Sequence, residues 1–194
     1  MLLLFYNGYE CQVYSFFITD LWISTGYITV DLNVLEYLIK QIHPGTDSIL
    51  SIISELYDEY EKLYGLESSS RHTKEPFYLY LPPRGIFITL ETENNIIAIG
   101  AYKPFSDDTA EIKRIWIHPE YRGQKIAGLV LHELERLAKK SGYSNLYLTT
   151  GTKQHKAVNL YLREGFKPHF DINISPDIYE YHPYDGKLRF TKEI

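Results

Sequence analysis

The segment Arg122-Gly-Gln-Lys-Ile-Ala-Gly128 lies between a β-type run, Glu111-Ile-Lys-Arg-Ile-Trp-Ile117, and a strongly amphipathic helical stretch. A strand, a small-residue loop and a helix start together suit a phosphate-bearing cofactor, because the first N–H groups of a helix have no partner within it and carry its partial positive charge. The small residues Gly123, Ala127 and Gly128 let the main chain approach a pyrophosphate. The cations Arg122 and Lys125 add positive charge at the same place.

The composition limits the classes of partner. The chain has 194 residues, 44% of them hydrophobic, which is enough for one domain with a substantial core. A formal net charge of -5 argues against nucleic acid as a partner, because phosphate backbones are met by clustered Lys and Arg. The single cysteine, Cys11, excludes an internal disulfide and fits a reducing compartment, so we expect a cytoplasmic protein. The seven histidines are scattered and no metal-ligand motif occurs, so no metal is expected.

The N-terminal stretch is apolar but too interrupted to cross a bilayer. Residues 1–30 carry only Glu10 and Asp20 as charges, without a basic segment ahead of the apolar runs. We expect residues 1–26 to form an extension, as a strand or partly buried, and residues 27–194 to form the domain. No membrane partner is expected. The extension can pack on its own domain or on a neighbour, so a monomer and a homodimer both remain open.

Hydrophobic periodicity predicts the first half of the domain. Thr29 to Asp31 is strand-like and runs into a helix whose apolar residues recur at helical spacing, namely Val34, Leu35, Leu38, Ile39 and Ile42. Asp47 or Ser48 is expected to cap a second helix, and Gly65 to end it. Ile86 to Leu90 and Ile96 to Tyr102 are short β runs, and Asn94-Asn95 between them predicts a hairpin.

The second half alternates strands and helices. The expected elements are a strand over Ala110 to Ile117, a helix that begins near Lys125 and is stopped by Gly142, a strand over Asn145 to Thr149, a helix over about Lys153 to Glu164, and a closing strand over Lys187 to Lys192. The sequence therefore predicts a mixed α/β domain with about six or seven strands.

Two blocks, in order and separated by one helix, resemble the GNAT N-acetyltransferases. Glu111 to Gly128 is similar to the family's acetyl-CoA motif, and Leu146 to Phe166, with its Ala-x-x-x-Tyr and Gly-Phe ending, is similar to the strand and helix that follow. The resemblance implies an α/β fold with a mixed, mostly antiparallel central sheet flanked by helices in three layers, α/β/α. It also implies acetyl-CoA as the acyl donor.

The resemblance carries a set of cofactor-binding residues onto this chain. Its members are main-chain groups at a splayed strand end, the phosphate loop, and one face of the last helix: Ile115, Trp116 and Ile117; Arg122, Gly123, Gln124, Lys125, Ile126, Ala127 and Gly128; and Gln154, Ala157 and Asn159. Gln154 and Asn159 are equally well explained as solvated helix residues. Lys125 departs from the family pattern, which has glycine there. We favour a lysine already in the first helical turn, since a positive φ would strain it.

Two residues are candidates for proton transfer. The resemblance makes Tyr161 the general acid that protonates the departing thiolate, and a phenol with a pKa of about 10 keeps its proton at neutral pH until a thiolate is formed beside it. The alternative is a core aromatic in a chain with 18 tyrosines. Glu111 is the candidate base for the amine. Its alternative is a simple ion pair with Lys113, two residues along the same strand face.

The resemblance favours an N-acetyltransferase that moves acetyl from acetyl-CoA to a primary amine, most simply of a small molecule, in a ternary complex. Two alternatives stay open: a non-catalytic acyl-CoA-binding regulatory module, and an acetyltransferase that acts on a protein amine. Tyr57, Tyr60 and Arg84 are candidates on the acceptor side, with ordinary packing and surface charge as their alternative.

Overall fold

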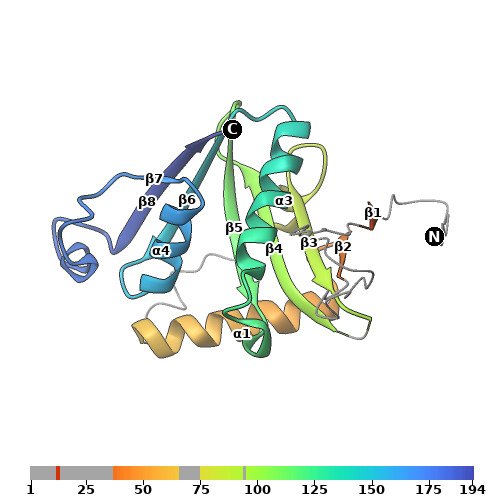
Figure 1. Cartoon of the computed structure of the whole chain (residues 1–194), viewed down its shortest axis with the longest axis horizontal. Coiled ribbons are helices and arrows are strands. Elements are labelled where there is room, and N and C mark those ends of the chain that lie inside the picture. Colours follow the sequence, from red (N-terminus) through yellow and green to blue (C-terminus); the bar gives the residue numbers. More distant parts are fainter. Residues whose placement is uncertain (1–11, 14–36, 66–74, 94) are drawn as a thin grey trace, which may run out of the picture.

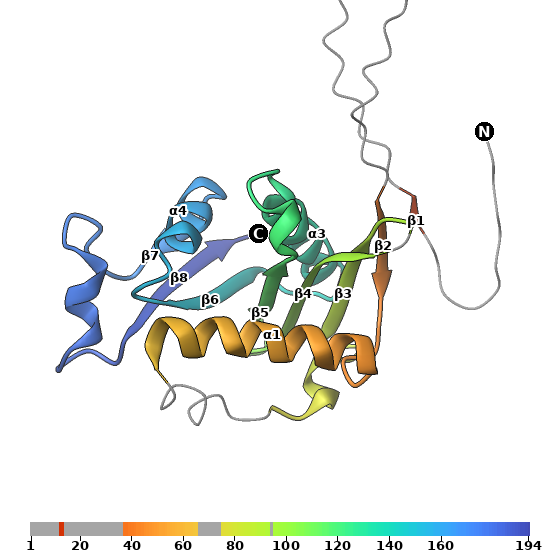
Figure 2. The same cartoon turned by 90° about the horizontal axis from the view of Figure 1, so that it is seen from below.

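One mixed sheet organises the molecule. The computed structural model describes residues 12–13, 37–65, 75–93 and 95–194. Eight strands follow the order β1-β2-β3-β4-β5-β6-β8-β7, and all neighbouring pairs are antiparallel except β5 with β6. Helix α1 covers one face of the sheet, and α3 and α4 cover the other (Figures 1 and 2). The mostly antiparallel, three-layer α/β/α class is therefore confirmed.

The bounds of the elements follow the predicted pattern closely in the second half of the chain. The strands are β1 Gln12–Val13, β2 Leu38–Gln41, β3 Ile86–Glu91, β4 Ile96–Pro104, β5 Thr109–Ile117, β6 Asn145–Gly151, β7 Lys167–Pro168 and β8 Lys187–Glu193; the helices are α1 Asp47–Tyr64, α3 Ile126–Lys140 and α4 His155–Arg163. Short 3₁₀ turns lie at Phe77–Tyr80, Pro119–Tyr121 and Pro176–Glu180. The sheet has eight strands among the described residues, where six or seven were expected. The difference comes from β1 and β7, which are only two residues long.

The predicted helix over Val34 to Ile42 is wrong where the structure describes it. Leu38–Gln41 is a strand, β2, which pairs antiparallel with β3, and the N–H of Ile42 continues the ladder to Phe87 O at 3.0 Å. Two adjacent apolar residues are compatible with both the helical and the strand period. The main-chain N–H and C=O groups of β3 pair with this segment and stabilise it as a strand. The strand expected at Thr29 to Asp31 lies outside the described residues.

Two cores hold the layers together. The larger lies between the sheet and the layer of α3 and α4, and includes Ile112, Val130, Leu134, Leu148 and Phe190. The smaller lies beneath α1, and includes Ile49, Ile52, Leu56, Phe87 and Trp116. Helix α1 begins one residue before Ser48, with Thr46 as N-cap, and Gly65 ends it as predicted, at φ 83°.

Candidate functional site

Strands β5 and β6 pair for only a short distance. The paired residues are Thr109 with Asn145, Ala110 with Leu146, and Glu111 with Tyr147. Beyond them the two ribbons diverge toward the N-terminal end of α3 (Figure 1). We call this the β5–β6 divergence. A divergence of this kind leaves main-chain N–H and C=O groups of β5 without a neighbouring strand.

A β-bulge in β5 lies at the start of the divergence. The register against β4 shifts between Ile99, which faces Trp116, and Ala101, which faces Lys113, and Arg114 takes a φ of 59°. An extra residue bends a strand and increases its local twist. Nothing in the sequence marked this position, because the residue in the left-handed region is an arginine and not a glycine.

The bulge decides which main-chain groups of β5 face the divergence. The N–H of His118 donates to Ile97 O of β4 at 2.9 Å, so the alternate residues Ile115 and Ile117 direct their groups away from β4. Consistently, Ile117 O accepts from Arg122 Nε at 2.9 Å. Trp116 faces Ile99, and its indole lies beneath α1 with 3% exposure. The side chain of Trp116 thus belongs to the smaller core, and a contact of its main chain with the cofactor stays a prediction.

The loop before α3 supplies a run of unpaired donors. The N–H groups of Gly123, Gln124, Lys125, Ile126 and Ala127 have no hydrogen-bond acceptor among the described residues. We call these five groups the amide cradle. Successive N–H groups at a helix N-terminus form a concave site for an anion, and the helix dipole adds to it.

Lys125 corrects the prediction for its conformation. It is the N-cap of α3 at φ 64° and ψ 7°, and the helix begins at Ile126. The left-handed region costs an L-residue about 1 kcal/mol, and Lys125 adopts it where the family pattern has glycine. Its ammonium has no ion-pair partner among the residues that the structure describes. A strained backbone therefore carries an uncompensated cation at the mouth of the amide cradle.

The other predicted loop residues divide into two groups. Arg122 bonds Glu59 on α1 at 2.5 Å as well as Ile117 O, and Gln124 Nε2 donates to Glu120 O at 3.1 Å, so both side chains hold the loop. The N–H of Gly128 donates to Lys125 O at 3.0 Å, and a side chain at Gly128 would begin 3.0 Å from a carboxylate oxygen of Glu164. Gly128 is therefore explained by helix packing, and the cradle ends before it.

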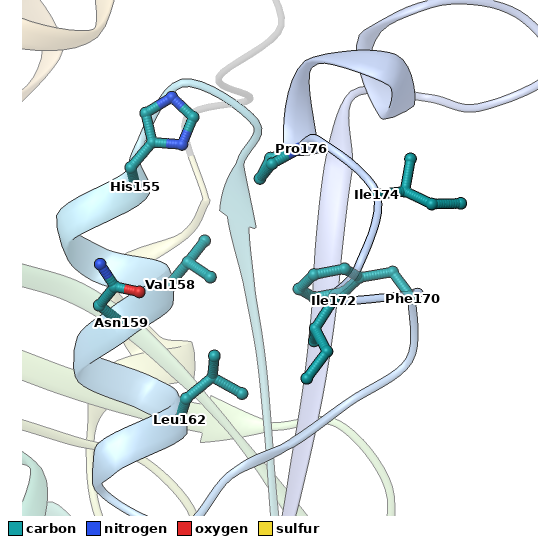
Figure 3. Close-up of a pocket in the computed structure, with 8 residues that line it drawn as sticks. All are labelled: His155, Val158, Asn159, Leu162, Phe170, Ile172, Ile174 and Pro176. Atoms are coloured by element: carbon teal, nitrogen blue, oxygen red, sulfur yellow. The ribbon is translucent and has the colours of Figure 1, made fainter.

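Helix α4 places its predicted residues on different sides. Gln154 is its N-cap residue, and its Oε1 accepts from Thr150 Oγ1 at 2.6 Å and from Gly151 N at 3.0 Å, which excludes a solvated side chain. Ala157 packs against the larger core. Asn159 is exposed and lines an apolar pocket of about 250 Å³ between α4 and the segment after β7 (Figure 3). The pocket is lined by residues of α4 and of the segment after β7, and the cofactor role of Asn159 stays a prediction.

Tyr161 lies in the larger core. Its ring makes edge contacts with Phe166 at 5.8 Å and Phe190 at 5.5 Å, measured between centroids. Burial, with a smaller contribution from Tyr60, raises the pKa of Tyr161. Tyr60 comes from α1 on the opposite face and hydrogen-bonds Gln154. The phenol therefore stays protonated over the whole physiological range, whichever role it has.

On the α1 side of β5, five charged side chains form one connected group, which we call the charge cluster: Glu75, Lys103, Glu111, Lys113 and Arg114. Lys103 Nζ lies 2.8 Å from Glu111 and 3.3 Å from Glu75, Lys113 Nζ lies 3.3 Å from Glu111, and Arg114 Nη2 lies 3.5 Å from Glu75. Side-chain exposure runs from 10% for Glu111 to 28% for Lys113. The expected ion pair of Glu111 with Lys113 exists, and the shorter pair with Lys103 was not foreseen.

Aromatic residues enclose this cluster. Arg114 lies over the ring of Tyr57 at 5.2 Å and near that of Tyr80 at 6.0 Å, and Tyr80 OH donates to Glu75. Burial would raise the pKa of the Glu75 carboxyl, but Tyr80 and the three neighbouring cations together hold it below its usual value. Burial would likewise lower the pKa of Lys103, but its bonds to Glu111 and Glu75 raise it overall. The Glu75 carboxyl and the Lys103 ammonium are therefore both ionised at neutral pH.

Arg84, a candidate on the acceptor side, has another role. Its guanidinium donates to Tyr143 OH at 3.0 Å and to the carbonyl oxygens of Ser106 and Asp107 at 3.0 and 2.9 Å. These contacts fix the β4–β5 turn. Tyr57 and Tyr60, by contrast, lie beside the charge cluster and the divergence.

Two searches of the described residues gave negative results. No three His, Cys, Asp or Glu side chains among them are grouped as metal ligands. Nor does any helix in the described part of the chain have the length and apolar character needed to cross a membrane.

An open α/β sheet with a strand divergence beside an amide cradle defines a protein of the acyltransferase class. The model of the acetyltransferase (GNAT) family matches residues 50–166, which is more than half of the chain. The chain belongs to the acetyltransferase (GNAT) family.

Individual relatives agree with this assignment. An uncharacterized N-acetyltransferase of Schizosaccharomyces pombe is 33% identical over 102 residues, which cover 49% of this chain and 62% of that protein. The match thus spans less than two thirds of that curated relative. A Klebsiella pneumoniae protein assigned as an acyl-CoA N-acyltransferase aligns with a TM-score of 0.61 at 25% identity over 81% of this chain and 97% of its own. A GNAT acetyltransferase from Elizabethkingia anophelis, solved with acetyl-CoA bound, shares the fold with a TM-score of 0.53 at 20% identity, over 81% and 98% of the two chains.

Proposed function

We propose that the chain transfers an acetyl group from acetyl-CoA to the primary amine of a small molecule, by direct attack in a ternary complex. The observation that carries the proposal is the amide cradle, five unpaired N–H groups that open beside the β5–β6 divergence. Family membership and the acetyl-CoA seen in the Elizabethkingia anophelis relative support the choice of donor.

The donor site is built mainly from backbone. The cradle fits a diphosphate, and Lys125 adds a formal charge beside it. The main-chain groups of Ile115 and Ile117 that face the divergence suit an extended amide-containing arm, which would add to β5 as a strand does. The same N–H groups are placed to polarise a thioester carbonyl, since fixed donors stabilise an oxyanion without reorganising.

Tyr161 is proposed as the proton donor. A bond forms between the amine nitrogen and the acyl carbon, the carbon–sulfur bond breaks, and the phenol of Tyr161 gives its proton to the leaving sulfur. Burial raises the pKa of Tyr161, so the phenol carries its proton at every working pH. This pKa lies above that of a thiol, so the proton transfer by itself is uphill, and conversion of the thioester to the amide drives it.

Glu111 is proposed as the acceptor of the amine proton, directly or through one water. Its two lysine partners, Lys103 and Lys113, hold the carboxylate in place, and they also act on the substrate. An ammonium next to Lys103, Lys113 and Arg114 is disfavoured, so these cations lower the pKa of a bound amine and ease its deprotonation.

Two measurements test the proposal. Saturating acetyl-CoA should shift the amide NMR resonances of Ile115, Ile117 and the cradle, while that of Lys167 in β7 stays in place. Free thiol should appear when acetyl-CoA is mixed with a suitable member of a panel of amino acids, polyamines, aminoglycosides and peptides. Unmoved cradle resonances would refute the donor site. Binding without thiol release for any amine would assign the chain to the non-catalytic acyl-CoA-binding class, and a preference for peptides would assign it to protein amines.

A further inference from the structure

We infer that the acceptor is an amine that also carries a carboxylate, of the free amino acid class, and that Arg114 and Lys113 bind this carboxylate. The inference rests on the proposed acetyl transfer and names the acceptor class for the same site. Its basis is the position, charge and geometry of the charge cluster.

The cluster borders the divergence on the face opposite α3. Glu111 is the last residue of β5 that pairs with β6, so the residues after it lie along the unpaired part of the strand. Lys113 lies on the same face as Glu111, as their contact at 3.3 Å shows. Arg114 would alternate to the other face in a regular strand, but the bulge returns it to the α1 side, over Tyr57. The bulge therefore places two consecutive cations beside the point where the strands separate.

The charges of the cluster do not cancel. Three cations face two carboxylates, and the side chains are 28% exposed or less, so water screens them poorly. A positive charge left over in such a place is costly unless an anion accompanies it. The excess lies at Lys113 and Arg114, because Lys103 already contacts both carboxylates.

Arg114 has the geometry for a carboxylate. Its contact with Glu75 is through Nη2 at 3.5 Å, which is long for a charge-assisted bond of about 2.7–2.9 Å. A guanidinium offers five donors in a fixed fork that suits both oxygens of a carboxylate. The rings of Tyr57 and Tyr80 hold the plane of the guanidinium. Arg114 is thus oriented in advance while part of its donor capacity is left for a ligand.

The amine of the same acceptor fits the rest of the cluster. When a carboxylate neutralises the excess charge, Glu111 remains within the cluster to take the amine proton. A diamine or polyamine would bring further positive charge to three cations, which is unfavourable. An amino acid brings a carboxylate for Arg114 and Lys113 and an amine for Glu111.

Matched substrates provide the test. The enzyme would be assayed by thiol release from acetyl-CoA with L-phenylalanine against 2-phenylethylamine, and with L-ornithine against putrescine, in a wider panel of such pairs. We expect kcat/KM for the best carboxylated member to exceed that of its decarboxylated partner by about 100-fold, because a site built for a polar group rejects the analogue that lacks it.

Variants of Arg114 and Lys113 test which side chains recognise the carboxylate. Arg114→Asn is the first choice, because asparagine adopts positive φ more readily than most residues. It should raise KM for the amino acid and reduce the preference to less than about 10-fold. The part of the rate that Arg114 contributes to amine deprotonation is lost for both members of a pair and cancels in this ratio. Lys113→Gln, at a more exposed position, should act in the same direction, and Arg163→Gln, on the exposed end of α4, should leave the preference intact.

The outcomes separate the two proposals. Equal or faster acetylation of the decarboxylated amines would overturn the carboxylate inference and leave the proposed acetyl transfer standing. Bound acetyl-CoA without transfer to any amine would overturn both. The comparison of substrate pairs uses the wild-type chain, so it decides the question even if Arg114→Asn does not fold.

Discussion

The two halves of the proposed site are built from different materials. The amide cradle at Gly123 to Ala127 consists of backbone donors at the start of a helix, and the side chains of the loop mostly hold it in place. The charge cluster on the opposite face consists of five side chains from β4, β5 and the segment before the Phe77–Tyr80 turn. In the proposed function, the first half would recognise the diphosphate that acyl-CoA donors share, and the second would be free to vary with the acceptor.

This difference has consequences for mutation. A backbone site changes little when one of its side chains is replaced, because the N–H group remains. A side-chain site loses a charge or a donor with each replacement, and leaves its partner unpaired. Variants in the two regions should therefore differ in kind, with the largest effects at the proton-transfer residues.

The largest effect is expected at Tyr161, the proposed proton donor. Tyr161→Phe should lower kcat by about 1,000-fold, as for loss of a positioned general acid, while the affinity for acetyl-CoA stays within about twofold. The ring remains, so its contacts with Phe166 and Phe190 are kept. Thiol release and calorimetric titration with acetyl-CoA measure the two quantities. Tyr181→Phe, at an exposed tyrosine after the last 3₁₀ turn, is the matched control. Undiminished turnover in Tyr161→Phe would leave its phenol a purely structural group.

Glu111→Gln separates the role of base from that of ion-pair partner. As a base, the residue should contribute about 100-fold to kcat, and the acid limb of the pH profile should change. As an ion-pair partner alone, its loss should destabilise the fold by roughly 1–3 kcal/mol, because Lys103 and Lys113 lose their common carboxylate, with activity nearly intact once folded. We expect both effects, measured by thiol release and by urea unfolding. A stability loss with unchanged kcat would remove Glu111 from the chemistry.

Lys125→Gly tests the cradle with two effects of opposite sign. Glycine relieves the positive φ and should stabilise the fold by about 1 kcal/mol. Removal of the ammonium should weaken acetyl-CoA binding by about fivefold at low salt, and less at high salt. Lys140→Gly, at the other end of α3, has neither the positive φ nor the nearby cradle, and should only destabilise. Unchanged affinity in Lys125→Gly at low salt would show that the backbone alone holds the diphosphate.

The donor half was largely predictable from the sequence, because backbone sites depend on local order. A strand to Ile117, a small-residue loop and a helix that begins near Lys125 follow from the local pattern, and in the structure the strand ends at Ile117 and the helix begins at Ile126. The error there concerns conformation, because Lys125 takes the left-handed region that was expected only for glycine.

The acceptor half was not predictable, because contacts distant in sequence create it. Lys103 meets Glu111 across two strands, and Glu75 arrives from a connection with no periodic pattern. The bulge that turns Arg114 toward α1 has no residue signature. Strand β2 is a second example of a feature that depends on a distant contact. The sequence pattern predicted a helix there, and only the pairing with β3 determines that the segment is a strand.

The smallest expected effect concerns the pH dependence of stability through Glu75. The pKa of Glu75 is lowered in the folded chain, so the unfolded chain binds more protons near the ordinary value of about 4.5. Its stabilising contribution is therefore fully present above that pH and is lost as the pH falls through the folded value. Urea unfolding of Glu75→Gln should show a deficit of about 1 kcal/mol at pH 7 that shrinks toward pH 3, whereas Glu193→Gln, exposed near the end of β8, should show none. A deficit that stays constant from pH 7 to pH 3 would mean that Glu75 stabilises by packing and hydrogen bonding alone, and that the charge cluster is not held by its ionisation.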